Sequence, residues 1–190
     1  MTRLTNEERK AVIERFFERI TEGIPVDQQW VTTMRTGSSP ELPQDPTREQ
    51  LDAWIELAEI VTDEGFIAEM RATTEKFWSD APSDFEPGAL FKAYAEVSDN
   101  AAQAMASGLS PSSSEGGAIA ERVITSHARA VHKEDDEGFR ASMLDGYANQ
   151  DPRAARYWEL LATIRGDESA AQQTRVTNWI AEAVRARLSG

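Results

Sequence analysis

The stretch QDPRAARYWELLATIRGDE, at positions 150–168, carries a complete set of helix signals. Asp151 is a typical N-cap, and Pro152 suits the first helical position because an N–H there would have no helical partner anyway. Gly166 marks the end, where a left-handed residue commonly closes a helix. Between these signals an apolar stripe recurs at helical spacing: Tyr157, Trp158, Leu161 and Ile164. The stretch therefore predicts one helix with a buried face.

A similar stretch occurs earlier in the chain, beginning at Gln44-Asp45-Pro46. From the tryptophan onward the two copies match at equal offsets, so that Trp54, Leu57, Ala58, Ile60, Asp63 and Glu64 correspond to Trp158, Leu161, Ala162, Ile164, Asp167 and Glu168. The spacer between Asp-Pro and Trp differs by two residues. We therefore expect two similar helices, each followed by a new helix that starts at an acidic cap.

The remaining segments show the same helical period. No segment alternates polar and apolar residues over the length of a strand. The sequence predicts an all-α fold, a compact orthogonal or globin-like bundle of about eight helices that forms a single domain over 1–190. Pro, Gly and Ser are frequent at 36–46 and 108–117, which predicts two flexible loops, with the next helix after the second loop starting near Ala118.

Composition excludes several classes of protein. The chain has no apolar run of about 18 residues, which favours a protein without a membrane-spanning helix. Its N-terminus lacks the apolar region of a signal peptide, and its zero cysteines exclude disulfides and thiolate chemistry, so we expect a cytoplasmic protein. The formal net charge of −13 would repel a phosphate backbone, and we expect that this domain itself binds no nucleic acid.

Motifs for catalysis, metals and cofactors are not evident in the sequence. The two histidines, His127 and His132, are five residues apart, unlike the i, i+4 pair that chelates a metal on one helix face. Gly116-Gly117 is not followed by the Lys-Ser/Thr of a phosphate-binding loop. We expect no cofactor, no metal and no enzymatic activity; an enzyme that uses a carboxylate with His127 is the weaker alternative.

The aromatic residues are the most informative side chains for binding. Most lie on predicted inward helix faces, where packing in a plain core is the simpler explanation. Several of them combine a ring with a polar group, as in the lining of pockets for flat or apolar ligands. The candidate ligand-binding residues are Trp54, Phe91, Tyr94, His127, Tyr147, Tyr157 and Trp158.

Four segments resemble a known family. The segment LPQDPTREQLDAWIELAE at 42–59 is similar to a stretch in the C-terminal regions of MerR-type transcriptional regulators of actinobacteria. The segments at 4–9, 63–66 and 151–161 resemble that family too. In such regulators an N-terminal winged helix-turn-helix binds DNA and the C-terminal region binds an effector. The resemblance implies an effector-binding region, because nothing in this sequence is typical of a winged helix.

These observations predict a domain that binds a small amphipathic or aromatic molecule, hydrophobic and of the antibiotic-like kind. The resemblance implies a role in transcription regulation. The alternative is a helical module for protein–protein interaction or dimerisation without a ligand, and a homodimer is open under either hypothesis.

Overall fold

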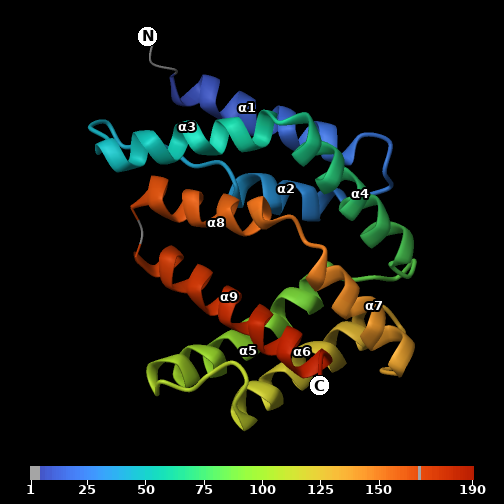
Figure 1. The fold of residues 1–190 in the computed structure, drawn as a ribbon. Helices are drawn as coiled ribbons and strands as arrows, with labels where there is room; N and C mark the ends of the chain where they lie inside the picture. The colour runs from blue at the N-terminus through green and yellow to red at the C-terminus, as the bar shows by residue number, and fades with distance from the viewer. Residues whose placement is uncertain (1–4, 167) are drawn as a thin grey trace. The chain divides into compact units, whose positions relative to one another are not determined.

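The computed structural model describes residues 5–166 and 168–190, without the side chains of 89–91 and 93. Within these ranges the chain forms nine α-helices and no strand, so the all-α fold class is confirmed (Figure 1). The helices are α1 (Asn6–Thr21), α2 (Gln28–Gly37), α3 (Arg48–Thr62), α4 (Glu64–Asp80), α5 (Pro87–Ala106), α6 (Ser114–Ala130), α7 (Glu137–Ala148), α8 (Pro152–Arg165) and α9 (Glu168–Leu188).

The chain folds into two compact units. Unit 1 holds the described residues of Met1–Asp80 and Asp151–Ala171, and unit 2 holds Ala81–Gln150 and Gln172–Gly190. Each unit has a core of its own. The core of unit 1 consists of Ile13, Phe16, Phe17, Ile20, Leu42, Ala53, Trp54, Leu57, Ile60, Val61, Phe66, Ile67, Tyr157, Leu160, Leu161 and Ile164. The core of unit 2 consists of Val97, Ala101, Ala104, Ile119, Ala120, Val123, Ile124, Val176, Trp179, Ile180, Ala183 and Val184.

Helices begin where the sequence places capping residues. The Thr47 hydroxyl accepts from the Gln50 N–H at 3.2 Å, and the Gln50 side chain accepts from the Thr47 N–H at 3.0 Å, which completes a capping box at the start of α3. The Asp63 carboxylate accepts from the Phe66 N–H at 2.8 Å, so the predicted acidic cap of α4 is confirmed. Its counterpart Asp167 lies outside the described residues.

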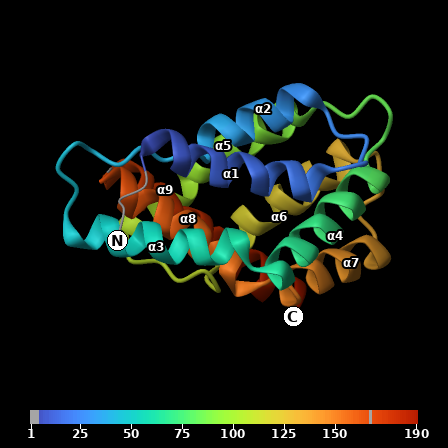
Figure 2. The ribbon, with the colours of Figure 1, turned by 90° about the horizontal axis from the view of Figure 1, so that it is seen from above.

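The two similar stretches form α3 and α8, and these helices pack against each other in unit 1. Gln50, near the start of α3, donates from Nε2 to the carbonyl of Ile164, near the end of α8, at 3.0 Å. Arg153, at the start of α8, donates to the Asp63 carboxylate, at the end of α3, at 2.7 Å. The two helices therefore run antiparallel, and both can be followed in Figure 2.

One boundary differs from its prediction. Helix α6 begins at Ser114, four residues before the expected start at Ala118. The Ser113 hydroxyl accepts from the Gly116 N–H at 3.1 Å, so the serine run supplies an N-cap, and Gly116 and Gly117 lie inside the first turns. None of the helices described here has the length and apolar character needed to cross a membrane.

Candidate ligand-binding pocket

Three of the predicted site residues lie in unit 1. Trp54 and Tyr157 are each only 5% exposed and belong to the same core, whereas Trp158 is 40% exposed. The Tyr157 ring lies 5.3 Å from the Trp158 ring in an edge-on arrangement, and its hydroxyl donates to the Ser38 carbonyl at 3.4 Å. Burial raises the pKa of Tyr157 to about 12. Trp54 and Tyr157 are therefore surrounded by packed side chains.

Two predicted tyrosines come together in unit 2. Burial raises the pKa of Tyr94 on α5, and the nearby Thr177 side chain partly offsets that shift. Burial raises the pKa of Tyr147 on α7 to about 12, and the nearby Tyr94 adds to that shift. The Arg185 guanidinium lies 5.9 Å from the centre of the Tyr147 ring. The two tyrosines thus pack against the same core, with Arg185 of α9 over the ring of Tyr147.

His127 lies on α6 with its ring 6.0 Å from the ring of Phe139. Burial lowers the pKa of His127, and the charge of Lys133 lowers it further, so the neutral imidazole is favoured. No group of three or more His, Cys, Asp or Glu side chains in the described ranges is arranged to hold a metal ion. The side chain of Phe91 lies outside the described residues.

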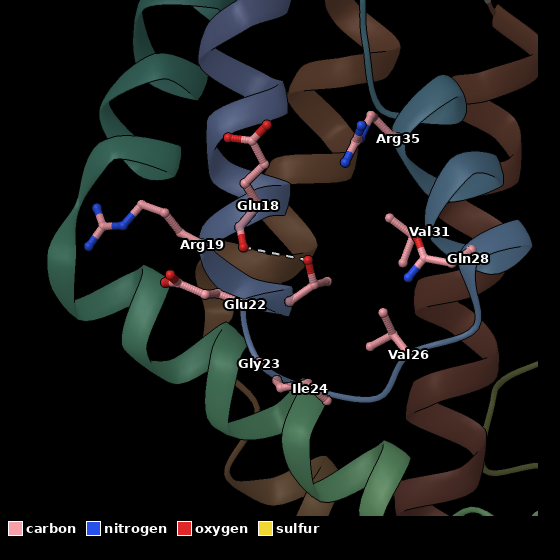
Figure 3. A pocket seen from close by; sticks show the side chains of 10 residues that line it. Glu18, Arg19, Glu22, Gly23, Ile24, Val26, Gln28, Val31 and Arg35 are labelled. Carbon is pink, nitrogen blue, oxygen red and sulfur yellow. Dashed lines mark hydrogen bonds between the residues drawn. The ribbon is translucent and has the colours of Figure 1, made fainter.

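An open pocket of about 540 Å³ lies in unit 1 between the end of α1 and one side of α2 (Figure 3). Its size falls within the range of about 300–1,000 Å³ that is usual for small-molecule sites. The lining residues are Glu18, Arg19, Thr21, Glu22, Gly23, Ile24, Val26, Gln28, Val31 and Arg35. None of the six predicted site residues with a described side chain is among them.

The local sequence explains the turn between α1 and α2 that leaves space for the pocket. Gly23 has a φ of +72°, a left-handed conformation that L side chains rarely adopt, and it follows the last turn of α1. Asp27 then caps α2, where its carboxylate accepts from the Trp30 N–H at 2.6 Å. The residues from Gly23 to Asp27 therefore turn the chain between two helices, and the pocket lies inside this turn.

Apolar side chains form one part of the lining. Val31 on α2 is 5% exposed, and Ile24 and Val26 in the connecting segment are half-buried. In Figure 3 the side chains of Val26 and Val31 face an open space, with α1 across from them. An apolar part of a ligand would gain from contact with this surface because it would leave water.

The charged lining residues differ in their partners. Arg19 donates to the Glu64 carboxylate of α4 at 2.8 Å, and this pairing lowers the pKa of Glu64. Arg35 on α2 has its Nε atom shielded from solvent and makes no hydrogen bond with any described residue through that atom. No ion pair joins the Arg35 guanidinium to another described side chain, so it is a lining cation with donors to spare.

A second pocket of about 400 Å³ is lined by Asn6, Arg9, Leu42, Pro43, Gln44, Pro46 and Leu51. Polar groups here join parts of the fold. The Asn6 side chain donates to the Leu42 carbonyl at 3.2 Å, and the Arg9 guanidinium lies 5.8 Å from the centre of the Trp54 ring. These contacts fasten the segment before α3 to α1, so we regard this pocket as part of the scaffold.

The lining of the α1–α2 pocket contains no aromatic side chain, whereas the site predicted from the sequence consists of aromatic residues and His127. The pocket lining consists of two valines, an isoleucine, a glutamine, a threonine, a glycine and four charged residues, all ordinary on amphipathic helices and the turns between them. The turn signals Gly23, Pro25 and Asp27 are visible in the sequence, but they indicate a connection and not a cavity. No family model, curated protein or solved structure matches this chain.

Proposed function

We propose that this chain binds a small amphipathic organic molecule in the α1–α2 pocket, without carrying out chemistry on it. The observation that carries the proposal is the combination, in one pocket of about 540 Å³, of an apolar surface and an arginine without a partner among the described residues. Three of the ten lining residues are apolar and most of the others are polar or charged, so the pocket suits a ligand that has both an apolar part and a polar group.

The resemblance of 42–59 and 151–161 to MerR-type regulators supports an effector-binding role for this pocket. Helix α2, which forms one wall, is joined to α8 at its C-terminal end: the Arg165 guanidinium donates to the Gly37 carbonyl, and Tyr157 donates to the carbonyl of Ser38. A ligand that restrains α2 would therefore restrain contacts of α8 as well. We propose that this connection reports ligand binding to the rest of a regulator.

A titration monitored by tryptophan fluorescence tests this function. Trp30 lies on α2 next to the lining residue Val31, and its ring is 5.4 Å from the ring of Trp78. We expect amphipathic compounds from a panel of hydrophobic drugs and dyes to change the emission in a saturable way. The substitution Val26→Leu narrows the pocket modestly, and Val26→Trp fills it, so affinity should fall in that order.

The control is Tyr147→Phe, which removes a hydroxyl from the predicted aromatic cluster in unit 2 and leaves the pocket unchanged. We expect this variant to bind as the unaltered chain does. Binding that is lost in Tyr147→Phe and kept in Val26→Trp would move the site to the tyrosines. Absence of binding for the whole panel would contradict the proposed function.

Dimerisation is the second candidate function, and two exposed side chains favour it. Ile55 on α3 is 50% exposed and Trp158 on α8 is 40% exposed, and both are in unit 1. Stable interfaces bury about 800 Å² per partner, so these residues would have to form part of a larger contact. Light scattering at several concentrations tests this alternative: a dimer that Ile55→Glu converts to a monomer would support it.

A further inference from the structure

The Arg35 guanidinium is the feature of the pocket that most needs explanation. A guanidinium carries five N–H donors in a planar fork, and a donor removed from water without a partner destabilises the folded state. Here Nε is shielded from solvent and has no acceptor among the described residues. Because Nε is closed to solvent, an acceptor from outside the chain would bond to the terminal nitrogens of the guanidinium, for which no described residue supplies a partner.

Figure 3 shows where such an acceptor would lie. Arg35 stands at one end of the open space, and Val26 and Val31 lie along the same side of it. The other lining arginine, Arg19, is occupied by its pair with Glu64. A ligand that reaches Arg35 would therefore place its body over the two valines and its charged end at the guanidinium.

We infer that the ligand of this pocket is an organic monoanion, a carboxylate or sulfonate attached to an apolar body, with its acid group bound by Arg35. A guanidinium binds a planar or tetrahedral oxyanion through two parallel N–H···O bonds, which neutral groups do not match. This inference rests on the proposed function and names the chemical class of the ligand for the same site.

The carboxylates of the lining limit the charge of the ligand to about one. Glu18 and Glu22 on α1 also line the pocket, and the chain as a whole carries a formal charge of −13. A doubly charged phosphate would meet these like charges with only one unpaired lining cation to offset them. A single acid group at the Arg35 end satisfies the cation and keeps the rest of the ligand uncharged.

Two dyes of nearly equal shape test the inference. Anilinonaphthalene sulfonate and phenylnaphthylamine share the same ring system, and only the first carries a sulfonate. Both fluoresce more strongly in an apolar site, so both can be titrated against the full chain. We expect the unaltered chain to bind both dyes and to prefer the sulfonate.

The decisive variant is Arg35→Met, which keeps an apolar stem of similar length and removes the charge. We expect it to weaken binding of the sulfonate by about tenfold, as expected for the loss of a charge-assisted hydrogen bond, and to leave phenylnaphthylamine within about twofold. Arg35→Lys keeps the charge without the fork and should give an intermediate loss. Arg15→Met, an exposed position on α1 outside the pocket lining, changes the net charge equally and should leave both dyes unaffected.

Each outcome separates this inference from the proposed function. Suppose that both dyes bind and that Val26→Trp abolishes binding of both, while Arg35→Met weakens their binding equally or not at all. That result would support the pocket as the binding site and contradict an anionic ligand. If Arg15→Met weakens binding of the sulfonate as much as Arg35→Met does, that result would likewise contradict a specific role of Arg35. If neither dye binds the unaltered chain, or if Val26→Trp weakens binding of neither dye, the result contradicts the proposed function itself, which is ligand binding in the α1–α2 pocket. Thermal unfolding of Arg35→Met checks that the variant is folded; we expect its stability to be unchanged or higher.

Discussion

Helices α3 and α8 share a sequence motif that starts at a tryptophan, and this tryptophan is buried in one helix and exposed in the other. Trp54 on α3 is 5% exposed, whereas its counterpart Trp158 on α8 is 40% exposed. The leucine three residues later is buried in both copies: Leu57 and Leu161 are 0% and 1% exposed. The leucine position is therefore buried in both helices, whereas the surroundings of each helix determine whether its tryptophan is buried.

The neighbours of α3 explain the difference. This helix packs against α1 and α4 as well as α8, whereas the main packing partner of α8 in unit 1 is α3. Arg9 of α1 lies over the Trp54 ring at 5.8 Å, so a third helix covers that tryptophan. Trp158 has an edge-on contact with Tyr157, its own neighbour in sequence. The same motif position is thus a core residue in α3 and a surface residue in α8.

Alanine substitution of the two tryptophans should give the largest difference. We expect Trp54→Ala to lower the free energy of unfolding by about 3–5 kcal/mol, because it leaves a cavity in the core of unit 1. Trp158→Ala should cost less: about 0.5–1.5 kcal/mol for the lost aromatic pair, and a smaller loss of burial than at Trp54. Urea denaturation of both variants measures these losses, and equal losses would show that Trp158 is as well packed as Trp54.

Gln50 should give an intermediate effect, because α8 has no equivalent of it. The position four residues before each tryptophan is Gln50 in α3 and Ala154 in α8. Gln50 accepts from the Thr47 N–H and donates to the Ile164 carbonyl, both at 3.0 Å, so one side chain caps α3 and joins it to α8. We expect Gln50→Ala to lower the free energy of unfolding by about 1–2 kcal/mol.

The variant Gln50→Glu separates the two roles of this side chain. Glutamate preserves the acceptor for the Thr47 N–H but has no donor for the Ile164 carbonyl at the end of α8. If the bond between the helices contributes, denaturation should show Gln50→Glu to be less stable than the unaltered chain. A Gln50→Glu variant as stable as the unaltered chain would assign the whole effect to the cap.

Much of the fold was predictable because its signals are local. The capping box at Thr47 and Gln50, the cap at Asp63 and the stop at Gly166 each depend on residues a few positions apart. The predicted start of α6 was wrong by four residues because Ser113 fits both a serine-rich loop and an N-cap. The antiparallel pairing of α3 and α8 depends on contacts about a hundred residues apart, and the matching motifs gave no direction for it.

The site was harder to predict because burial is not a local property. Trp54 and Trp158 have the same motif position, yet only the packing of α1 over one of them makes it a core residue. Arg35 looks like an ordinary basic residue near the end of a helix, and its significance comes from its place in the pocket lining and from the lack of a described partner for its guanidinium. A sequence pattern indicates which groups a chain carries, whereas unsatisfied groups become visible only in three dimensions.

The smallest expected effect concerns the exposed ion pair between Arg156 of α8 and Glu56 of α3. The motif position two residues after the tryptophan is Glu56 in α3 and the buried Leu160 in α8. Arg156 on α8 donates to the Glu56 carboxylate at 2.7 Å, and this bond holds the pKa of Glu56 below its ordinary value. Because both side chains are more than 40% exposed, the pair should contribute only about 0.2–1 kcal/mol near pH 7.

The dependence on pH identifies this pair. A carboxylate whose pKa is lower in the folded chain contributes its full stabilisation above the unfolded pKa, near about 4.3, and loses it as the pH falls through the folded pKa. The deficit of Glu56→Gln relative to the unaltered chain should therefore be greatest above about pH 5 and shrink on acidification. Glu59→Gln is the matched control, since Glu59 lies exposed on the same helix and forms no ion pair with a described residue. Chemical denaturation from pH 3 to pH 7 measures both deficits, and a Glu56→Gln deficit that is independent of pH, or matched by Glu59→Gln, would show that the pair contributes nothing to joining the two helices.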